Sequence, residues 1–253
     1  METILITGAS GGIGSAAAKK LASPRRHLIL HANRHSQFVE DLCRTIRLQG
    51  GNADITAADF SCEDAADKLL QNISELTDHT DILVNAAGLD LMSPDMTGQS
   101  FEHKLRKIFQ VDVFTPIRLS KQIGAKMKTQ KGGTIFFFGW NGVQHGWSGE
   151  TAQLYGTAKG ALIGFCRSLA EELSPEVLIR CLSLGWIQTR WGDSLRQSAG
   201  NASTAQRYAA DSLQNRWGTP EDVAAAIEFL SQKSSAFIDG VGLPVDGGKR
   251  GSR

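Results

Sequence analysis

The sequence predicts an α/β fold in which a doubly wound, parallel sheet of about seven strands carries helices on both faces. Short β-rich runs alternate with helix-like segments along most of the chain, as in parallel βαβ units. The first of these runs leads directly into a glycine-rich turn that opens a helix. With 253 residues, 41% of them hydrophobic and 21% charged, the chain can bury one full core. We therefore expect a single domain over residues 1–253.

The predicted strands are, in chain order, Thr3–Thr7, His27–Ala32, Ala53–Ala57, Ile82–Asn85, Thr134–Phe138, Leu178–Ser183 and Gly242–Val245. The helix-like segments are Ala16–Leu21, Phe38–Gln49, Cys62–Leu76, Gly98–Lys128, Thr151–Leu173 and Pro220–Ser231. Residues 189–215 follow the sixth strand and show little pattern. Because ligands bind beyond the carboxyl ends of such strands, we expect this segment to be a substrate lid. The alternative is an ordinary surface excursion.

A glycine-rich turn follows the first strand, with Gly8, Gly12 and Gly14 at its bends. Glycines let the backbone approach a pyrophosphate, and the helix that follows offers free N–H groups and the positive end of its dipole. An isolated glycine-rich loop is usually only a turn. A strand, these glycines and a helix in this order favour dinucleotide binding in a Rossmann domain.

Tyr155 and Lys159 lie four residues apart in a predicted helix, so both side chains project from one face. An ammonium beside a phenol lowers the pKa of the phenol from its ordinary value of about 10. A tyrosine tuned in this way can exchange a proton with a carbonyl or an alcohol. Alone, the spacing is common on surface helices. Together with the glycine-rich turn it indicates catalysis.

Further motifs extend this pattern to the end of the chain: Asn85–Gly88, Arg216–Val223 and Val245–Gly248. In sequence order, the five motifs resemble those of the short-chain dehydrogenase/reductase family over residues 3–248. The C-terminal motifs are most similar to those of 3-oxoacyl-[acyl-carrier-protein] reductases. The resemblance implies an oxidoreductase that transfers hydride between a nicotinamide cofactor and a carbonyl or alcohol. It implies that Tyr155 gives the proton and that Lys159 tunes it and holds the nicotinamide ribose.

The four cysteines show no spacing typical of a metal site, so no metal is expected. Carried over position by position, the resemblance also implies cofactor contacts. The implied cofactor residues are Gly8, Ser10, Gly12, Ile13, Gly14, Asn33, Arg34, His35, Asp59, Phe60, Asn85, Ala86, Gly88, Tyr155, Lys159, Gly185, Ile187 and Thr189. Asp59 matches the family aspartate at the adenine amino group. Its alternative role is the N-cap of the helix expected from Cys62.

The loop after the second strand bears on the choice between NAD and NADP. An NAD enzyme needs an acidic residue there for the ribose 2′-hydroxyl, and residues 30–36 contain none. Arg34 offers a guanidinium suited to a 2′-phosphate, with Asn33, His35 and Ser36 as further donors. We expect NADP(H) in preference to NAD(H), although Arg34 can also be read as a solvated loop residue.

Two positions depart from the family's catalytic tetrad. Asp112 stands where an asparagine is usual, and Trp140 stands where a serine is usual. Asp112 can pair with Lys159, which would weaken the effect of the lysine on Tyr155. We expect the amide of Asn141 to replace the serine by polarising the substrate carbonyl. The alternative is that Asn141 only forms a turn with Gly142.

Other features bear on the substrate and its surroundings. Four tryptophans, Trp140, Trp147, Trp186 and Trp191, are expected near the substrate mouth, where they can form an apolar or aromatic binding surface. The alternative for at least two of them is a packing role. A proline usual before Gly185 is missing, which would loosen that turn. Lys126, Lys128 and Lys131 could receive an acyl carrier protein, whereas Glu171, Glu172 and Glu176 argue against one.

A net charge of +1 without a basic cluster disfavours a nucleic-acid partner. Absence of a long apolar run, and a first strand that begins at residue 3, lead us to expect a cytoplasmic protein without a membrane partner. The resemblance implies a homo-oligomer, tetramer or dimer. The competing hypothesis is a non-catalytic dinucleotide-binding sensor or scaffold, which would not need the pair of Tyr155 and Lys159.

Overall fold

The computed structural model describes residues 1–34, 36–189, 206, 208–238 and 240–248. Its centre is a seven-stranded sheet in the order β3-β2-β1-β4-β5-β6-β7, with every neighbouring pair parallel. The strands are β1 (Glu2–Thr7), β2 (Arg26–Ala32), β3 (Asn52–Ala57), β4 (Ile82–Asn85), β5 (Gly133–Trp140), β6 (Val177–Leu184) and β7 (Val241–Val245). All predicted strands are present, with ends that differ by only a residue or two. The predicted doubly wound sheet is confirmed.

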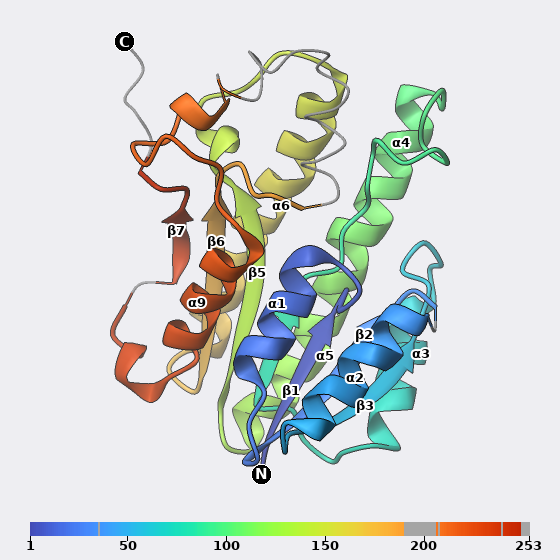
Figure 1. The fold of residues 1–253 in the computed structure, drawn as a ribbon, viewed down its shortest axis with the longest axis vertical. Coiled ribbons are helices and arrows are strands. Elements are labelled where there is room, and N and C mark those ends of the chain that lie inside the picture. The colour runs from blue at the N-terminus through green and yellow to red at the C-terminus, as the bar shows by residue number, and fades with distance from the viewer. Residues whose placement is uncertain (35, 190–205, 207, 239, 249–253) are drawn as a thin grey trace.

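Helices cover both faces of the sheet (Figure 1). The near face in that view carries α1 (Gly12–Leu21), α2 (Gln37–Leu48) and α9 (Pro220–Leu230). The other face carries α3 (Ala65–Ser74), α5 (Thr115–Thr129) and α6 (Glu150–Leu173), and α4 (Phe101–Phe109) precedes α5. Short helices complete the elements: η1 (Gln110–Phe114), η2 (Asn141–Gln144) and η3 (Lys233–Ser235). In the part of the chain described, no helix has both the length and the apolar character to cross a membrane.

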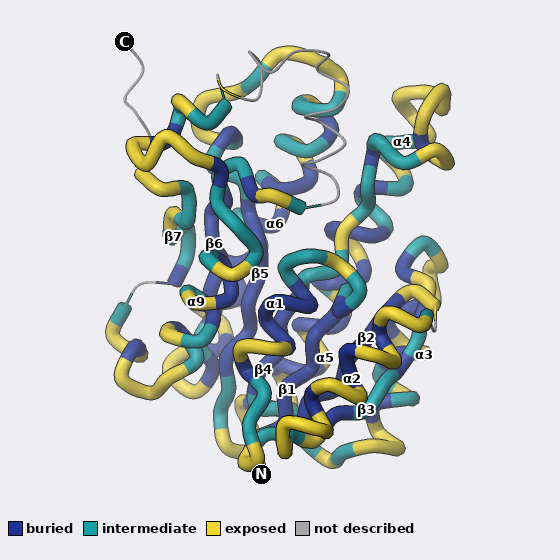
Figure 2. Tube along the Cα trace, in the orientation of Figure 1, coloured by how far each residue is buried: buried dark blue, intermediate teal, exposed yellow. Residues whose placement is uncertain are grey.

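Alternate residues of the strands build two separate cores, because successive side chains of a strand point to opposite faces. In β5, Phe136 and Phe138 pack with the α1, α2 and α9 side, whereas Ile135 and Phe137 pack with the α3, α5 and α6 side. Figure 2 shows the resulting pattern, with buried strands inside and exposed residues on outer helix faces and loops. The sheet is thus buried on both faces, as is usual for parallel sheets.

The strand order reverses direction between β1 and β4, which lie next to each other although β2 and β3 intervene in sequence. Ligands of such sheets bind at this switch point, outside the carboxyl ends of the strands. The β1–α1 turn and the loop after β4 meet here. The fold therefore places a site where the sequence predicted dinucleotide binding.

The helix predicted over residues 98–128 is interrupted by η1, a π-helical turn. Pro116 explains the interruption, because proline has no N–H to donate and its ring crowds the carbonyl four residues earlier, which belongs to Asp112. The Thr115 N–H bonds instead to the Gln110 carbonyl, five residues back. π-Helical turns often occur at functional sites. This one carries Asp112 into the interior.

Candidate active site

The β1–α1 turn is built for close backbone approach. Gly8 has a φ of 67°, and a Cβ on it would lie 2.6 Å from the backbone of Ala87. A Cβ on Gly14 would lie 2.2 Å from the Gly8 carbonyl oxygen. No side chain caps the start of α1, and its first turn contains no acidic residue. The N–H groups of Gly12, Ile13 and Gly14 at the start of α1 therefore remain available to an anion such as a pyrophosphate.

A groove of about 590 Å³ runs from this turn across the carboxyl ends of β1, β2 and β4. Predicted cofactor residues that line it are Gly8, Ser10, Gly12, Ile13, Asn33, Asp59, Phe60, Ala86, Gly88, Tyr155 and Thr189. Its length and its uncapped helix fit a dinucleotide. We call it the nucleotide groove.

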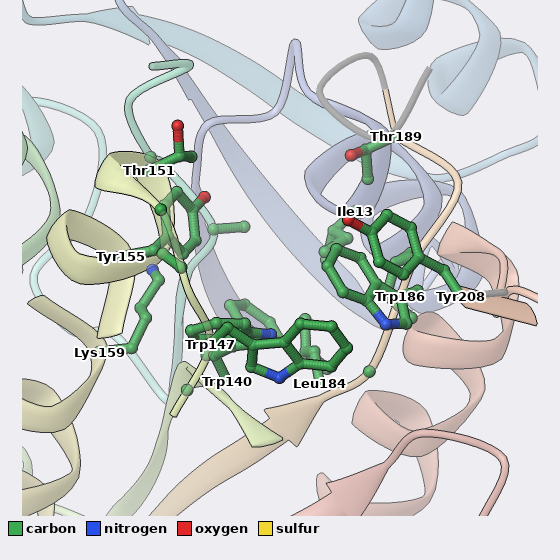
Figure 3. Close-up of a pocket in the computed structure, with 18 of the residues that line it drawn as sticks. Ile13, Trp140, Trp147, Thr151, Tyr155, Lys159, Leu184, Trp186, Thr189 and Tyr208 are labelled. Atoms are coloured by element: carbon green, nitrogen blue, oxygen red, sulfur yellow. The ribbon is translucent and has the colours of Figure 1, made fainter. Parts of the chain in front are cut away.

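A second cavity of about 380 Å³ adjoins the nucleotide groove, and we call it the substrate cavity. Four predicted cofactor residues line this cavity and not the nucleotide groove: Asn85, Lys159, Gly185 and Ile187. Both hollows are lined by Ile13, Ala86, Ala87, Gly88, Tyr155 and Thr189. Tyr155 thus stands at the junction, with its ring facing the open space in Figure 3. A hydride donor in the groove and a substrate in the cavity would meet beside this hydroxyl.

Lys159 lies one helical turn beyond Tyr155 on α6, as predicted. Its Nζ is 5.5 Å from the centroid of the Tyr155 ring and donates to Oδ2 of Asp112 at 2.9 Å. Oδ1 of Asp112 accepts from the Leu89 N–H at 2.7 Å. The Asp112 side chain is fully buried, so this ion pair is shielded from solvent. The predicted contact between Asp112 and Lys159 is present.

The protonation of Tyr155 differs from the expectation. Burial raises the pKa of Tyr155 to about 12. Lys159 lowers this pKa, whereas Asp112 and Asp90 raise it, all by less than burial does. Burial also disfavours the charged form of Lys159, but Asp112 and Tyr155 outweigh it and raise the pKa of the lysine. The prediction of a lowered tyrosine pKa is therefore wrong for this state. The Tyr155 hydroxyl is therefore neutral at pH 7.

The structure does not place Asn141 as predicted. Its amide donates to Oδ2 of Asp246 at 3.3 Å. Asn141 lines a small hollow that adjoins the substrate cavity across Trp147 and Trp186, and it does not line the substrate cavity itself. Trp140 lines the substrate cavity instead, with its ring 6.5 Å from that of Tyr155. The cause is η2, which begins at Asn141 directly after β5 and turns the chain away. The carbonyl-polarising role of Asn141 does not fit this geometry.

The loops around the adenine end of the groove refine two further predictions. Asp59 does not cap a helix, because α3 begins at Ala65, and its Oδ1 accepts instead from the Ser61 N–H at 2.9 Å. Asp59 still lines the nucleotide groove. Arg34 is exposed and makes no ion pair with a described residue. His35, and most of the predicted lid at 189–215 together with Trp191, lie outside the described residues.

Asn85 of the Asn85–Gly88 motif links the end of β4 to β5 and α5 through hydrogen bonds. Its Nδ2 donates to Ser120 Oγ and to the Phe136 carbonyl, both at 3.1 Å. Its Oδ1 is buried without a hydrogen-bond partner among the described residues. A buried acceptor left in this way is suited to a donor that a ligand brings.

His31 is a groove residue that the sequence reasoning missed. It stacks on Phe60 with ring centroids 4.3 Å apart. Its Nε2 lies 2.9 Å from the Ala58 carbonyl oxygen, and its Nδ1 accepts from the Gly8 N–H at 3.4 Å. Burial lowers the pKa of His31 to about 4, against a smaller opposite effect of its bond to Ala58. The neutral ring thereby joins β2 to the glycine turn. A histidine within a buried strand was the available signal.

The three lysines considered for an acyl carrier protein lie far from this edge of the sheet. Lys126 and Lys128 are in the last turn of α5, and Lys131 follows just before β5 begins at Gly133. They are therefore at the amino ends of the strands, whereas the substrate cavity is at the carboxyl ends. These lysines do not form a rim around its mouth.

Comparisons with known proteins agree with this geometry. A family model described as enoyl-(acyl carrier protein) reductase matches residues 8–250. The chain belongs to the short-chain dehydrogenase/reductase family. The short-chain reductase protein NovJ of Streptomyces niveus is 32% identical over 250 residues, covering 97% of this chain and 92% of NovJ. The 3-oxoacyl-[acyl-carrier-protein] reductase FabG of Aquifex aeolicus is 29% identical over 251 residues, covering 96% of this chain and 95% of FabG.

A solved structure assigned as an NAD(P)-dependent gluconate 5-dehydrogenase, from Beutenbergia cavernae, is also similar. It contains NADP at low occupancy and has a TM-score of 0.84 at 26% identity, covering 97% of this chain and 95% of that one. The short-chain dehydrogenase/reductase described here is thus an NAD(P)-dependent oxidoreductase that acts on small molecules.

Proposed function

We propose that this enzyme is an NADP(H)-dependent reductase of carbonyl compounds, and in reverse a dehydrogenase of alcohols. The observation that carries the proposal is the place of Tyr155, at the junction of the nucleotide groove and the substrate cavity. The nicotinamide, when bound, supplies or accepts the hydride. In reduction the carbonyl carbon gains that hydride and the carbonyl oxygen gains the Tyr155 proton, so an alcohol forms.

Other residues of the chain would fix the charges near Tyr155 and hold the cofactor. The Asp112–Lys159 pair is buried next to Tyr155 and keeps its charges fixed without solvent reorganisation. Gly8, Gly12 and the first turn of α1 would hold the pyrophosphate, and Arg34 would hold the 2′-phosphate that distinguishes NADP. The NADP bound to the Beutenbergia protein supports this cofactor.

The test is steady-state oxidation of NADPH with a panel of ketones, aldehydes and 3-oxoacyl thioesters. The wild-type protein should turn over members of the panel. Tyr155→Phe should reduce turnover by about 10²–10⁴, the range typical of a lost general acid, while NADPH binding is retained. Equal turnover by wild type and Tyr155→Phe would refute the assigned proton donor. If NADPH binds and no carbonyl of the panel reacts, a cofactor sensor is the better description.

The family resemblance also supports a homo-oligomer, a tetramer or a dimer. The resemblance implies that subunits pair across the final strand, around residues 237–246. The side chain of Phe237, just before β7, is fully exposed in the single chain. Light scattering of the purified protein should give a multiple of 27.3 kDa. A single-chain mass at micromolar concentration would contradict the proposal.

A further inference from the structure

Aromatic rings form most of the wall of the substrate cavity opposite Tyr155. Trp186, just after β6, stacks on Tyr208 with centroids 4.1 Å apart and an interplanar angle of 16°. Trp147 meets Trp186 edge-on at 5.5 Å. In Figure 3, Trp186 and Tyr208 face Tyr155 across the opening, with Trp140 and Trp147 between the two sides. We call Trp147, Trp186 and Tyr208 the aromatic wall.

The aromatic wall lines the substrate cavity and packs on Trp217. Trp217 is 5% exposed and packs 5.7 Å from Trp186 and 6.2 Å from Tyr208, so it is a core residue. It does not line the substrate cavity, whereas all three members of the wall do and are only half-buried. The wall therefore presents ring surface to a ligand in a position fixed by the protein. Rings placed in advance bind with little loss of side-chain freedom.

The charged side chains described in the lining of the substrate cavity are already paired. Among the described residues that line it, only Lys159 and Glu150 are charged. Lys159 is bound to Asp112 at 2.9 Å, and Glu150 to Lys104 at 2.8 Å. A phosphate or carboxylate on a substrate would find no unpaired cation among these residues. Burial of an unpaired anion is costly, so the lining disfavours such substrates.

We propose that the substrate is an uncharged aryl ketone, or the corresponding aryl alcohol, whose ring packs on the aromatic wall while its oxygen meets the Tyr155 hydroxyl. The inference rests on the proposed function and narrows it to one substrate class. Aromatic rings gain from stacked and edge-on contacts beyond the area that they bury. A saturated ring of the same size gains only the area. A sugar would also need several polar partners, and the wall offers it mainly ring surface.

The experiment compares three matched ligands: acetophenone, cyclohexyl methyl ketone and 4-acetylbenzoate. Their binding to the NADP-loaded protein is measured by ligand-observed NMR, and their reduction by NADPH absorbance. Acetophenone should bind about 3- to 10-fold more tightly than cyclohexyl methyl ketone, the range that aromatic contacts provide. The carboxylate of 4-acetylbenzoate should weaken binding relative to acetophenone. Equal affinity for the two neutral ketones, or a preference for the anionic one, would overturn the inference.

Variants locate the effect. Trp186→Leu should abolish the preference for acetophenone, and Trp147→Leu should reduce it. Trp147 lies in the loop before α6, so its variant keeps the test informative if Trp186→Leu does not fold. The control is Phe229→Leu, which removes an exposed aromatic ring on α9, outside the substrate cavity. It should keep the full preference. A preference that survives in both tryptophan variants contradicts the assigned wall.

The two readouts separate this inference from the proposed function. An aryl preference in binding without NADPH oxidation by any ketone would support the wall and refute the reductase. Oxidation of NADPH by ketones without an aryl preference would support the reductase and refute the substrate class.

Discussion

The carboxylate of Asp112 lies 2.9 Å from the ammonium of Lys159, and the two charges of this buried ion pair act on the pKa of Tyr155 in opposite directions. Burial is the largest effect and raises the pKa of the phenol, Lys159 lowers that pKa, and Asp112 offsets part of the effect of the lysine. The raised pKa keeps the phenol protonated, as a proton donor in carbonyl reduction must be. It is unfavourable for a base in alcohol oxidation.

Asp112→Asn should therefore move the pH dependence of alcohol oxidation. The change removes a charge that raises the pKa of Tyr155 and leaves the Lys159 charge that lowers it. The pH at half-maximal oxidation should fall by about one to two units, the usual effect of a nearby charge. Since the pKa of Tyr155 is about 12 in the wild type, initial rates from pH 6 to 11 should still be rising at pH 11 in the wild type and should begin to level off in the variant. Asp67→Asn, at an exposed ion pair on α3, should leave the profile unmoved, and an unchanged profile in Asp112→Asn would contradict the coupling.

His31 should make stability depend on pH. Its pKa is about 4 in the fold and 6.5 when exposed, so between these values the unfolded chain binds the extra proton. The contribution of neutral His31 to the free energy of unfolding is complete above pH 6.5. It is lost as the pH falls toward 4, and the total loss is about 3 kcal/mol. Urea unfolding at pH 7 and pH 4.5 should show a smaller loss in His31→Gln than in wild type. The control is His103→Gln, at an exposed site on α4, which should lose as much free energy of unfolding as the wild type. An equal loss in His31→Gln and wild type would contradict the role of His31.

Arg34→Ala tests the preference for NADP(H). The exposed guanidinium has no ion-pair partner among the described residues and is available to a 2′-phosphate. The dissociation constant of NADPH should rise about tenfold or more, in the range of a charge-assisted hydrogen bond, and that of NADH should hardly change. Titrations of cofactor fluorescence measure both. Equal losses for the two cofactors would show that Arg34 does not read the phosphate.

Asn141→Ala tests the correction made by the structure. The Asn141 amide bonds to Asp246 and does not line the substrate cavity, so turnover should change less than tenfold. The free energy of unfolding should fall by about 1–2 kcal/mol, because Asp246 loses a donor. Kinetics and urea unfolding of the same preparation give both numbers. A loss of 10²–10³ in turnover, as for a removed oxyanion donor, would restore the original hypothesis.

The fold was predictable because its signals are local. The strands are short apolar runs, and the glycine turn must sit where a strand meets a helix, as Gly8 and Gly14 do. The positions of Tyr155 and Lys159 followed from helical spacing alone. These features depend on neighbours in the chain, which the sequence displays.

The predictions for Asn141 and for the pKa of Tyr155 failed because they depend on contacts between residues far apart in the sequence. The direction of the Asn141 side chain depends on Asp246, which is more than a hundred residues away and reaches it only after β7 has joined the sheet. The pKa of Tyr155 depends on how deeply it is buried, which no spacing shows. Pro116 was visible in the sequence, and it could have warned that the helix around Asp112 is not regular.

Trp140 and Gly142 form a unit that has to be exchanged together. A Cβ on Gly142 would lie 2.3 Å from the Trp140 ring, so the indole occupies space that any other residue at 142 would need. To install the usual serine by Trp140→Ser alone would leave a void beside Gly142 and Gly156, which solvent could enter next to Tyr155. A laboratory conversion to the common tetrad must therefore refill that volume as well as restore the hydroxyl. The same coupling makes single steps between the two arrangements costly.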